Sequence, residues 1–157
     1  MDMLKQAVNT NAWDGRWFKR AYTDDGKVIG SMQNEEARID SIAQSWSVIS
    51  GAGEAEKQKI AMEEVENQLI DEENAVIKLL DPPFEKGDIN PGYIKSYLPG
   101  VRENGGQYTH AALWVIWAIS LMEQGDKAIK YYKYLTPIEH ARTREIANMY
   151  KVEPYVI

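Results

Sequence analysis

The chain has 157 residues, of which 44% are hydrophobic and 27% charged, and its net charge is −6. These values predict one globular domain with a buried core. Because cysteine is absent and only two histidines occur, we expect neither disulfides nor a metal site. No basic stripe points to a nucleic-acid partner, and no apolar run reaches the ~18 residues of a membrane segment. The N-terminus lacks a signal-peptide core, so we expect a cytoplasmic protein.

Residues 12–30 predict a short β-hairpin, preceded by the end of a helix over residues 1–11. Aromatic side chains supply the expected strand residues, namely Trp17, Phe18 and Tyr22. Two acidic residues followed by a glycine, Asp24-Asp25-Gly26, supply the turn.

Residues 40–70 predict a helical hairpin. Its first helix is capped by Asp40 or Ser41 and ends at the glycines of residues 51–53. Its second helix covers residues 54–69. We expect both apolar stripes to be buried. They comprise Ile42, Ala43, Trp46, Val48 and Ile49 in the first helix and Ile60, Met62, Val65 and Leu69 in the second.

Residues 81–106 form a long connection rich in proline and glycine, and a loop of this length in a compact domain is usually functional. Residues 107–135 predict a second helical hairpin. Its first helix is apolar nearly all round, so we expect Trp114 and Trp117 to be buried core residues. Its second helix carries its apolar residues on one face, namely Ile129, Tyr132 and Leu135. Residues 142–157 predict a terminal helix and tail.

The two helical hairpins resemble each other. In both, an apolar helix, a turn of glycine and an acidic residue, and an amphipathic helix follow in order, and the copies lie about 70 residues apart. Repeated hairpins stack side by side, each burying a face on its neighbour. Two hairpins are too few to close a ring, so the pattern indicates part of a larger helical toroid.

The most informative segment is residues 100–110, where a polar, glycine-rich elbow leads into the apolar helix. Adjacent Gly105 and Gly106 permit backbone turns that side chains forbid. His110 follows at the start of the helix, with Arg102 and Glu103 close by in sequence. Polar groups on a loop with a rigid apolar support suit a polyhydroxylated or anionic ligand.

Several of these residues have a plainer interpretation. A histidine at a helix start can be a cap or a core residue, and we expect His140, in a polar segment, to be exposed to solvent. The acidic residues Glu35, Glu36 and Asp40 could be catalytic carboxylates, but acidic residues also collect at helix N-termini. The five tryptophans and nine tyrosines would suit a sugar cleft or a helical core equally well.

Four segments closely resemble glycoside hydrolase family 94, whose members are inverting glycoside phosphorylases. They are residues 34–46 (NEEARIDSIAQSW), 91–94 (PGYI), 99–110 (PGVRENGGQYTH) and 151–156 (KVEPYV). The resemblance covers residue 12 to the end. Residues 135–142 (LTPIEHAR) are most similar to the cyclic β-1,2-glucan synthase branch, which carries the same domain at its C-terminal end.

The resemblance implies an (α/α)6 barrel, of which this chain holds about two helical hairpins plus ends. It also implies phosphorolysis of a β-glucosidic bond to α-glucose 1-phosphate, with no cofactor and with inorganic phosphate as co-substrate. An aspartic acid protonates the departing oxygen, while phosphate replaces the water and the general base of an inverting hydrolase.

The resemblance also implies roles for individual residues. His110 matches the phosphate-binding histidine, and Arg102, Tyr97, Tyr93 and Glu103 match the substrate-binding wall. Tyr93 stands where cellobiose phosphorylases have an acid, so acceptor preference is expected to differ. Asn104, Gly105 and Gly106 match the signature that shapes the elbow.

Two family motifs do not occur in this sequence: Asp-Trp-Asn-Asp, which holds the catalytic acid, and the Thr-Gly-Ser phosphate loop. We therefore assign no catalytic residue to this chain and expect it to be inactive alone. The alternative is a non-catalytic helical module for carbohydrate binding or assembly. In either case the helix faces left uncovered predict a homo-oligomer, or association with a complementing remainder of the domain.

Overall fold

The computed structural model describes residues 2–151. This part of the chain is mainly helical, with small two-stranded antiparallel sheets between the helices, which confirms the predicted fold class at that level. The predicted tail after residue 151 lies outside the described residues. No helix among residues 2–151 is long and apolar enough to cross a membrane.

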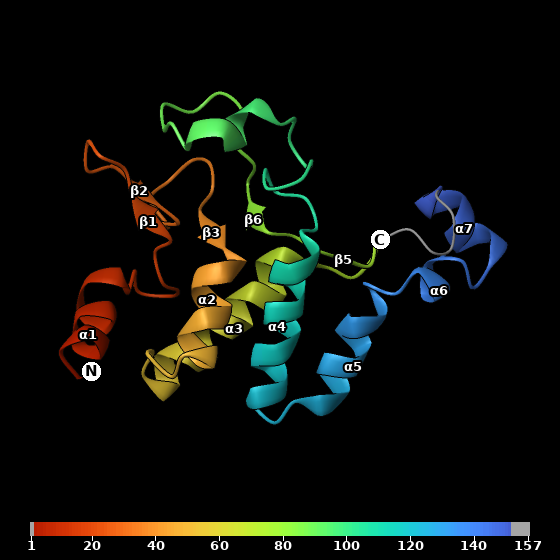
Figure 1. The fold of residues 1–157 in the computed structure, drawn as a ribbon, viewed down its shortest axis with the longest axis horizontal. Coiled ribbons are helices and arrows are strands. Elements are labelled where there is room, and N and C mark those ends of the chain that lie inside the picture. Colours follow the sequence, from red (N-terminus) through yellow and green to blue (C-terminus); the bar gives the residue numbers. More distant parts are fainter. Residues whose placement is uncertain (1, 152–157) are drawn as a thin grey trace.

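Four helices form the body of the molecule (Figure 1). They are α2 (Ser41–Ile49), α3 (Ala55–Leu69), α4 (Thr109–Leu121) and α5 (Gly125–Lys133). Helix α2 packs against α3 and α4, and α4 packs against α5, so two helical hairpins stand side by side. Helices α2 and α4 both begin at the end of this layer that the long connection crosses (Figure 1).

The N-terminal segment has the predicted helix and hairpin but differs in the residues that form the strands. Helix α1 (Asp2–Ala7) continues into a π-helical turn, η1 (Val8–Ala12). The hairpin pairs only β1 (Ala21–Tyr22) with β2 (Val28–Ile29). Trp17 and Phe18 are not on these strands. They are buried in the core, where large aromatic rings gain more than on an exposed ribbon. The Trp17 indole N–H donates to the carbonyls of Gly30 and Arg38 at 3.0 and 2.9 Å.

Two further short ladders lie next to helix ends, one before α2 and one after α3. Strand β3 (Ile39–Asp40) pairs with β6 (Leu80–Asp81), and β4 (Ile70–Asp71) pairs with β5 (Val76–Ile77). The Asp81–Pro82 peptide bond is cis. The Leu79 N–H donates to the Gly106 carbonyl at 2.9 Å, and the Leu79 carbonyl accepts from the Ser41 N–H at 2.8 Å. Residue 79 thus joins the segments that lead into α2 and α4.

Helix α2 buries the face opposite to the predicted one. Asp40 caps the helix, as expected, by accepting from the Ile42 N–H at 2.8 Å. The buried residues of α2 are polar and small, namely Ser41, Gln44, Ser45 and Ser47. Gln44 exchanges hydrogen bonds with the Phe18 backbone at 2.8 and 2.9 Å, so its burial leaves no amide group unpaired. The apolar stripe is only half-buried, and Trp46 is 40% exposed.

Helix α4 has one buried face rather than burial on most sides. Its buried residues are Ala111, Ala112, Val115, Ala118 and Ile119. Trp117 is 50% exposed, and it lines a groove with Leu113, Ile129 and Tyr132 that no residue of 2–151 covers. On α5 the buried residues are Ala128 and Tyr131, so the predicted stripe there was wrong for Ile129 and Tyr132, as it was for Ile60 on α3.

The C-terminal segment contains a helical turn that the sequence did not predict, α6 (Pro137–His140), before α7 (Arg144–Tyr150). His140 was expected in solvent but is 8% exposed. Its ring stacks on Tyr150 with the centroids 4.1 Å apart, and Nε2 lies 2.7 Å from the Tyr134 carbonyl oxygen. The polar neighbours in sequence gave no sign of this stacking partner.

Candidate functional site

The long connection is held in shape by a buried asparagine. Asn104 accepts a hydrogen bond from the Phe84 N–H and donates to the carbonyls of Phe84 and Tyr97, all at 2.8 Å. One amide group therefore ties together three parts of the connection: residue 84, the elbow, and residue 97 just beyond the 3-10 helix η2 (Gly92–Ser96). An asparagine is needed because the same side chain must both accept and donate.

The two glycines of the elbow have no room for a side chain. Gly105 has a φ of +86°, and a Cβ atom there would lie 2.9 Å from Pro83 Cγ. A Cβ on Gly106 would lie 2.8 Å from the Gly100 carbonyl oxygen and 2.9 Å from that of Arg102. Neighbouring segments of the chain therefore approach more closely here than a residue with a Cβ atom would allow.

All four predicted substrate-binding residues lie together on this connection; we call them the loop cluster (Tyr93, Tyr97, Arg102 and Glu103). The rings of Tyr93 and Tyr97 meet edge to face with centroids 6.2 Å apart. The Arg102 guanidinium lies 4.9 Å from the centre of the Tyr97 ring, and Arg102 Nε lies 3.7 Å from Glu103 Oε2. The Tyr93 hydroxyl donates to Glu103 Oε1 at 3.4 Å.

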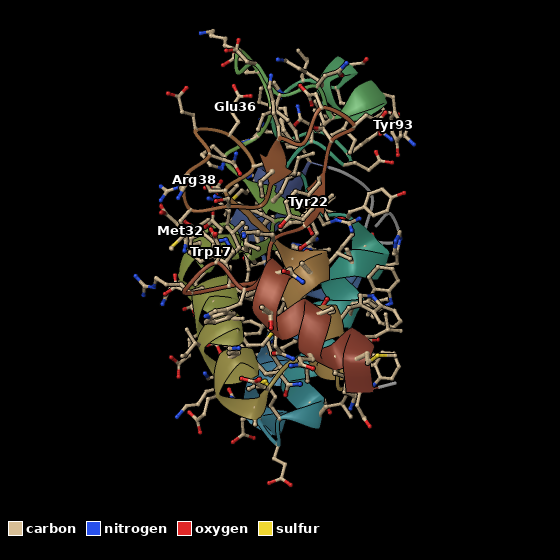
Figure 2. All side chains as sticks on the ribbon, turned by 90° about the vertical axis from the view of Figure 1, so that its left-hand side faces the viewer. Trp17, Tyr22, Met32, Glu36, Arg38 and Tyr93 are labelled. Carbon is tan, nitrogen blue, oxygen red and sulfur yellow. The ribbon has the colours of Figure 1, made fainter. Side chains whose placement is uncertain are left out.

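The electrostatics of the loop cluster follow from this placement. The Glu103 carboxylate is the main reason why the pKa of the Tyr93 hydroxyl is raised. Tyr93 belongs to η2, is 64% exposed and stands at the outer edge of the connection (Figure 2). The cluster thus offers two aromatic rings, a guanidinium and a carboxylate on one surface. This combination can stack on a sugar and hydrogen-bond its hydroxyl groups.

His110 lies in the first turn of α4, exposed to solvent. Its ring meets Tyr108 edge to face at 4.6 Å and Trp114 at 4.7 Å. Tyr108 is also close enough to Tyr93 to contribute to the raised pKa of its hydroxyl. His110, the predicted phosphate-binding residue, and the loop cluster therefore lie on either side of Tyr108.

Beyond His110 a groove of about 630 Å³ runs between η1, α2 and α4. Trp46 and Trp114 lie on it with their rings 5.4 Å apart, and Lys19 and Arg20 also line it. Sequence reasoning did not connect Lys19, Arg20 or either tryptophan with His110. Their proximity depends on how α2 packs against α4 and on the path of residues 13–20, which no local pattern reveals.

The acidic residues near α2 have structural roles. Asp40 is buried, and burial raises the pKa of its carboxyl to about 6 against the opposing effect of Arg20, whose Nε lies 3.3 Å away. Glu36 Oε1 accepts from the N–H groups of Lys86 and Gly87 at 2.7 and 2.8 Å. Glu36 therefore fastens the start of the connection to the segment before α2, at the same end of the molecule as Tyr93 (Figure 2).

The family of this chain follows from its sequence along its whole length. The model of the glycosyl hydrolase 94 superfamily catalytic domain matches residues 1–157, and the chain belongs to this family. It is 47% identical over its whole length to the cyclic beta-(1,2)-glucan synthase NdvB of Rhizobium meliloti. It is 32% identical over 152 residues to the solabiose phosphorylase of Paenibacillus borealis, and 29% over 154 residues to the N,N'-diacetylchitobiose phosphorylase of Vibrio proteolyticus.

The chain covers only part of these relatives. Its matched residues make up 100% of this chain but 6% of the glucan synthase. For the two phosphorylases they make up 97% of this chain and 19% of the relative. The family model spans the loop cluster, His110 and both helical hairpins, so the geometry described above belongs to a segment of the family's catalytic domain.

Proposed function

We propose that this chain forms one wall of the active site of an inverting glycoside phosphorylase domain with an (α/α)6 barrel. The observation that carries the proposal is the loop cluster, which adjoins His110 at the end of the helical layer where α2 and α4 begin. The wall faces a β-glucoside or β-glucan and inorganic phosphate.

In the proposed reaction an oxygen of phosphate attacks the anomeric carbon from the face opposite the leaving group. The bond between that carbon and the glycosidic oxygen breaks, and an aspartic acid protonates the departing oxygen. The products are α-glucose 1-phosphate and the shortened sugar, and the reaction is reversible. His110 donates a hydrogen bond to the phosphate and so stabilises its charge in the transition state.

The loop cluster holds the acceptor sugar in this proposal. Tyr97 offers a ring for stacking, with Arg102 packed over it, and Arg102 and Glu103 bind hydroxyl groups. Tyr93 replaces the acid of cellobiose phosphorylases, so a polar aromatic edge stands where a carboxylate would otherwise meet the sugar. Asn104, Gly105 and Gly106 hold the elbow that presents these groups.

The catalytic acid and half of the phosphate site are supplied from outside these 157 residues, because the sequence contains neither the Asp-Trp-Asn-Asp motif nor the Thr-Gly-Ser loop. Loss of a general acid typically costs ~10²–10⁴-fold in rate. We therefore propose that the chain alone is inactive and that its uncovered helix faces associate with the remainder of the domain or with a second copy. Its expected location is the cytoplasm.

The test is phosphate release from α-glucose 1-phosphate with a panel of β-glucoside acceptors, using the purified chain. No release is expected, because the acid is missing. Release that disappears in His110→Ala would support phosphorolysis but refute the incomplete site. If a longer natural form of the protein, carrying both motifs, also released no phosphate, the non-catalytic binding or assembly module would be the better account.

A further inference from the structure

The His110 ring is oriented by aromatic contacts rather than by a hydrogen bond. Catalytic and ligand-binding histidines usually have one ring nitrogen fixed by a carboxylate or a carbonyl group. Within residues 2–151 neither nitrogen of His110 has such a partner, whereas Tyr108 and Trp114 meet its ring edge to face at 4.6 and 4.7 Å. Both nitrogens therefore remain available to a ligand while the ring itself is held.

The contact does not end at Trp114. The Trp114 ring meets Trp46 of α2 at 5.4 Å with an interplanar angle of 77°. Four rings thus form a continuous edge-to-face row, in the order Tyr108, His110, Trp114 and Trp46. The row starts at the end of the connection and crosses from the second helical hairpin to Trp46 in the first, so the direction of the His110 ring depends on the packing of α2 against α4.

We infer that Trp114, supported from behind by Trp46, is a positioning residue that sets the orientation of the His110 imidazole for an oxyanion ligand. The inference rests on the proposed function for the identity of that ligand. Trp114 is half-buried and Trp46 is 40% exposed, although both are large apolar side chains that would gain from full burial. Both lie on the groove beside His110, where their rings support the row.

The test uses the fact that His110 and His140 are the only histidines in the chain. Imidazole carbon–proton NMR spectra of the 157-residue protein contain two sets of ring signals, and His110→Ala assigns them. The probe ligand is inorganic phosphate. The variants are Trp114→Leu, which removes the ring, Trp114→Phe, which keeps an aromatic edge, and Trp46→Leu. Trp117→Leu is the matched control, because Trp117 lies on the same helix and has no ring contact within residues 2–151.

Trp114→Leu is expected to move the His110 ring signals toward random-coil positions. It should also raise the phosphate concentration that half-saturates their shift by roughly 2- to 12-fold, the equivalent of one aromatic pair. Trp46→Leu should act in the same direction. Trp114→Phe should keep the His110 ring signals and the phosphate affinity close to those of the unaltered protein. Trp117→Leu should change neither quantity.

Two results would overturn the inference. One is an unchanged set of His110 signals in Trp114→Leu, and the other is an equal change in Trp117→Leu, which would indicate general loosening of α4. If phosphate leaves the His110 signals of the unaltered protein unmoved, the proposed function fails on this point. The ring signals of the variants still decide whether Trp114 positions His110.

Discussion

Asn104→Ala should destabilise the protein strongly, although residue 104 lies in a loop. The side chain is fully buried and makes three hydrogen bonds of 2.8 Å to the backbone of Phe84 and Tyr97. Removing it leaves one N–H and two carbonyl groups without their partner, and each orphaned buried group costs about 1–3 kcal/mol where water cannot reach it. Since the Tyr97 carbonyl is only partly buried, we expect a total loss of about 2–4 kcal/mol.

The assay is urea unfolding followed by circular dichroism, with thermal unfolding in parallel. A loss of this size corresponds to a fall in Tm of about 5–15 °C for a domain of this length. Asn90→Ala is the matched control. Asn90 lies in the same connection, but its single hydrogen bond, from the Gly92 N–H at 3.0 Å, is exposed. Asn90→Ala should therefore lower the free energy of unfolding by no more than about 0.5 kcal/mol. Equal effects of the two variants would refute the claim that the hydrogen bonds of Asn104 hold the connection in shape.

Three further predictions follow from the buried carboxylate, the elbow and the uncovered faces. Because burial raises the pKa of Asp40 from 3.8 to about 6, its charge costs stability above pH 6, and this cost disappears as the pH falls toward 3.8. Asp40→Asn, which keeps the helix cap, should therefore raise the free energy of unfolding by up to about 3 kcal/mol at pH 8 and leave it unchanged near pH 4. Urea titrations at the two pH values would measure both. Gly106→Ala should lose about 1–3 kcal/mol because its Cβ meets backbone atoms, whereas Gly125→Ala, with nothing within 4 Å, should be neutral in the same assay. Light scattering should detect a homo-oligomer that dissociates when Trp117 and Ile129 are both replaced by glutamine, and a monomeric unaltered chain would contradict this.

Helix positions could be read from the sequence because they depend on local signals. The Asp40 cap and the glycines after residue 50 set the limits of α2, apolar periodicity located α3 and α5, and a nearly continuous apolar run located α4. The short turn α6 was missed because four residues carry too little periodicity to be seen. It is marked only by Pro137 at its first position.

The buried faces could not be read in the same way, because burial depends on which neighbours are present. Gln44 and Ser45 are polar yet buried, since backbone groups satisfy them. Trp117 and Ile129 are apolar yet exposed, since nothing within residues 2–151 covers the groove between α4 and α5. A sequence pattern shows that a face is apolar, but it does not show whether its partner belongs to the same stretch of chain.

The candidate site was predicted through the family resemblance more than through local pattern. Tyr93, Tyr97, Arg102 and Glu103 lie up to ten residues apart, and only the path imposed by the elbow brings them together. The aromatic row behind His110 joins two separate helices, so it requires the tertiary packing.

The central claim is that the loop cluster and His110 form one wall of a sugar and phosphate site. The most direct measurement is a backbone amide NMR titration of the chain with a β-linked glucose disaccharide, in the presence and absence of inorganic phosphate. The account predicts sugar-dependent shifts confined to residues 93–108 and phosphate-dependent shifts at the first turn of α4. Shifts centred on α6 and α7, or no shift at saturating sugar and phosphate, would contradict it.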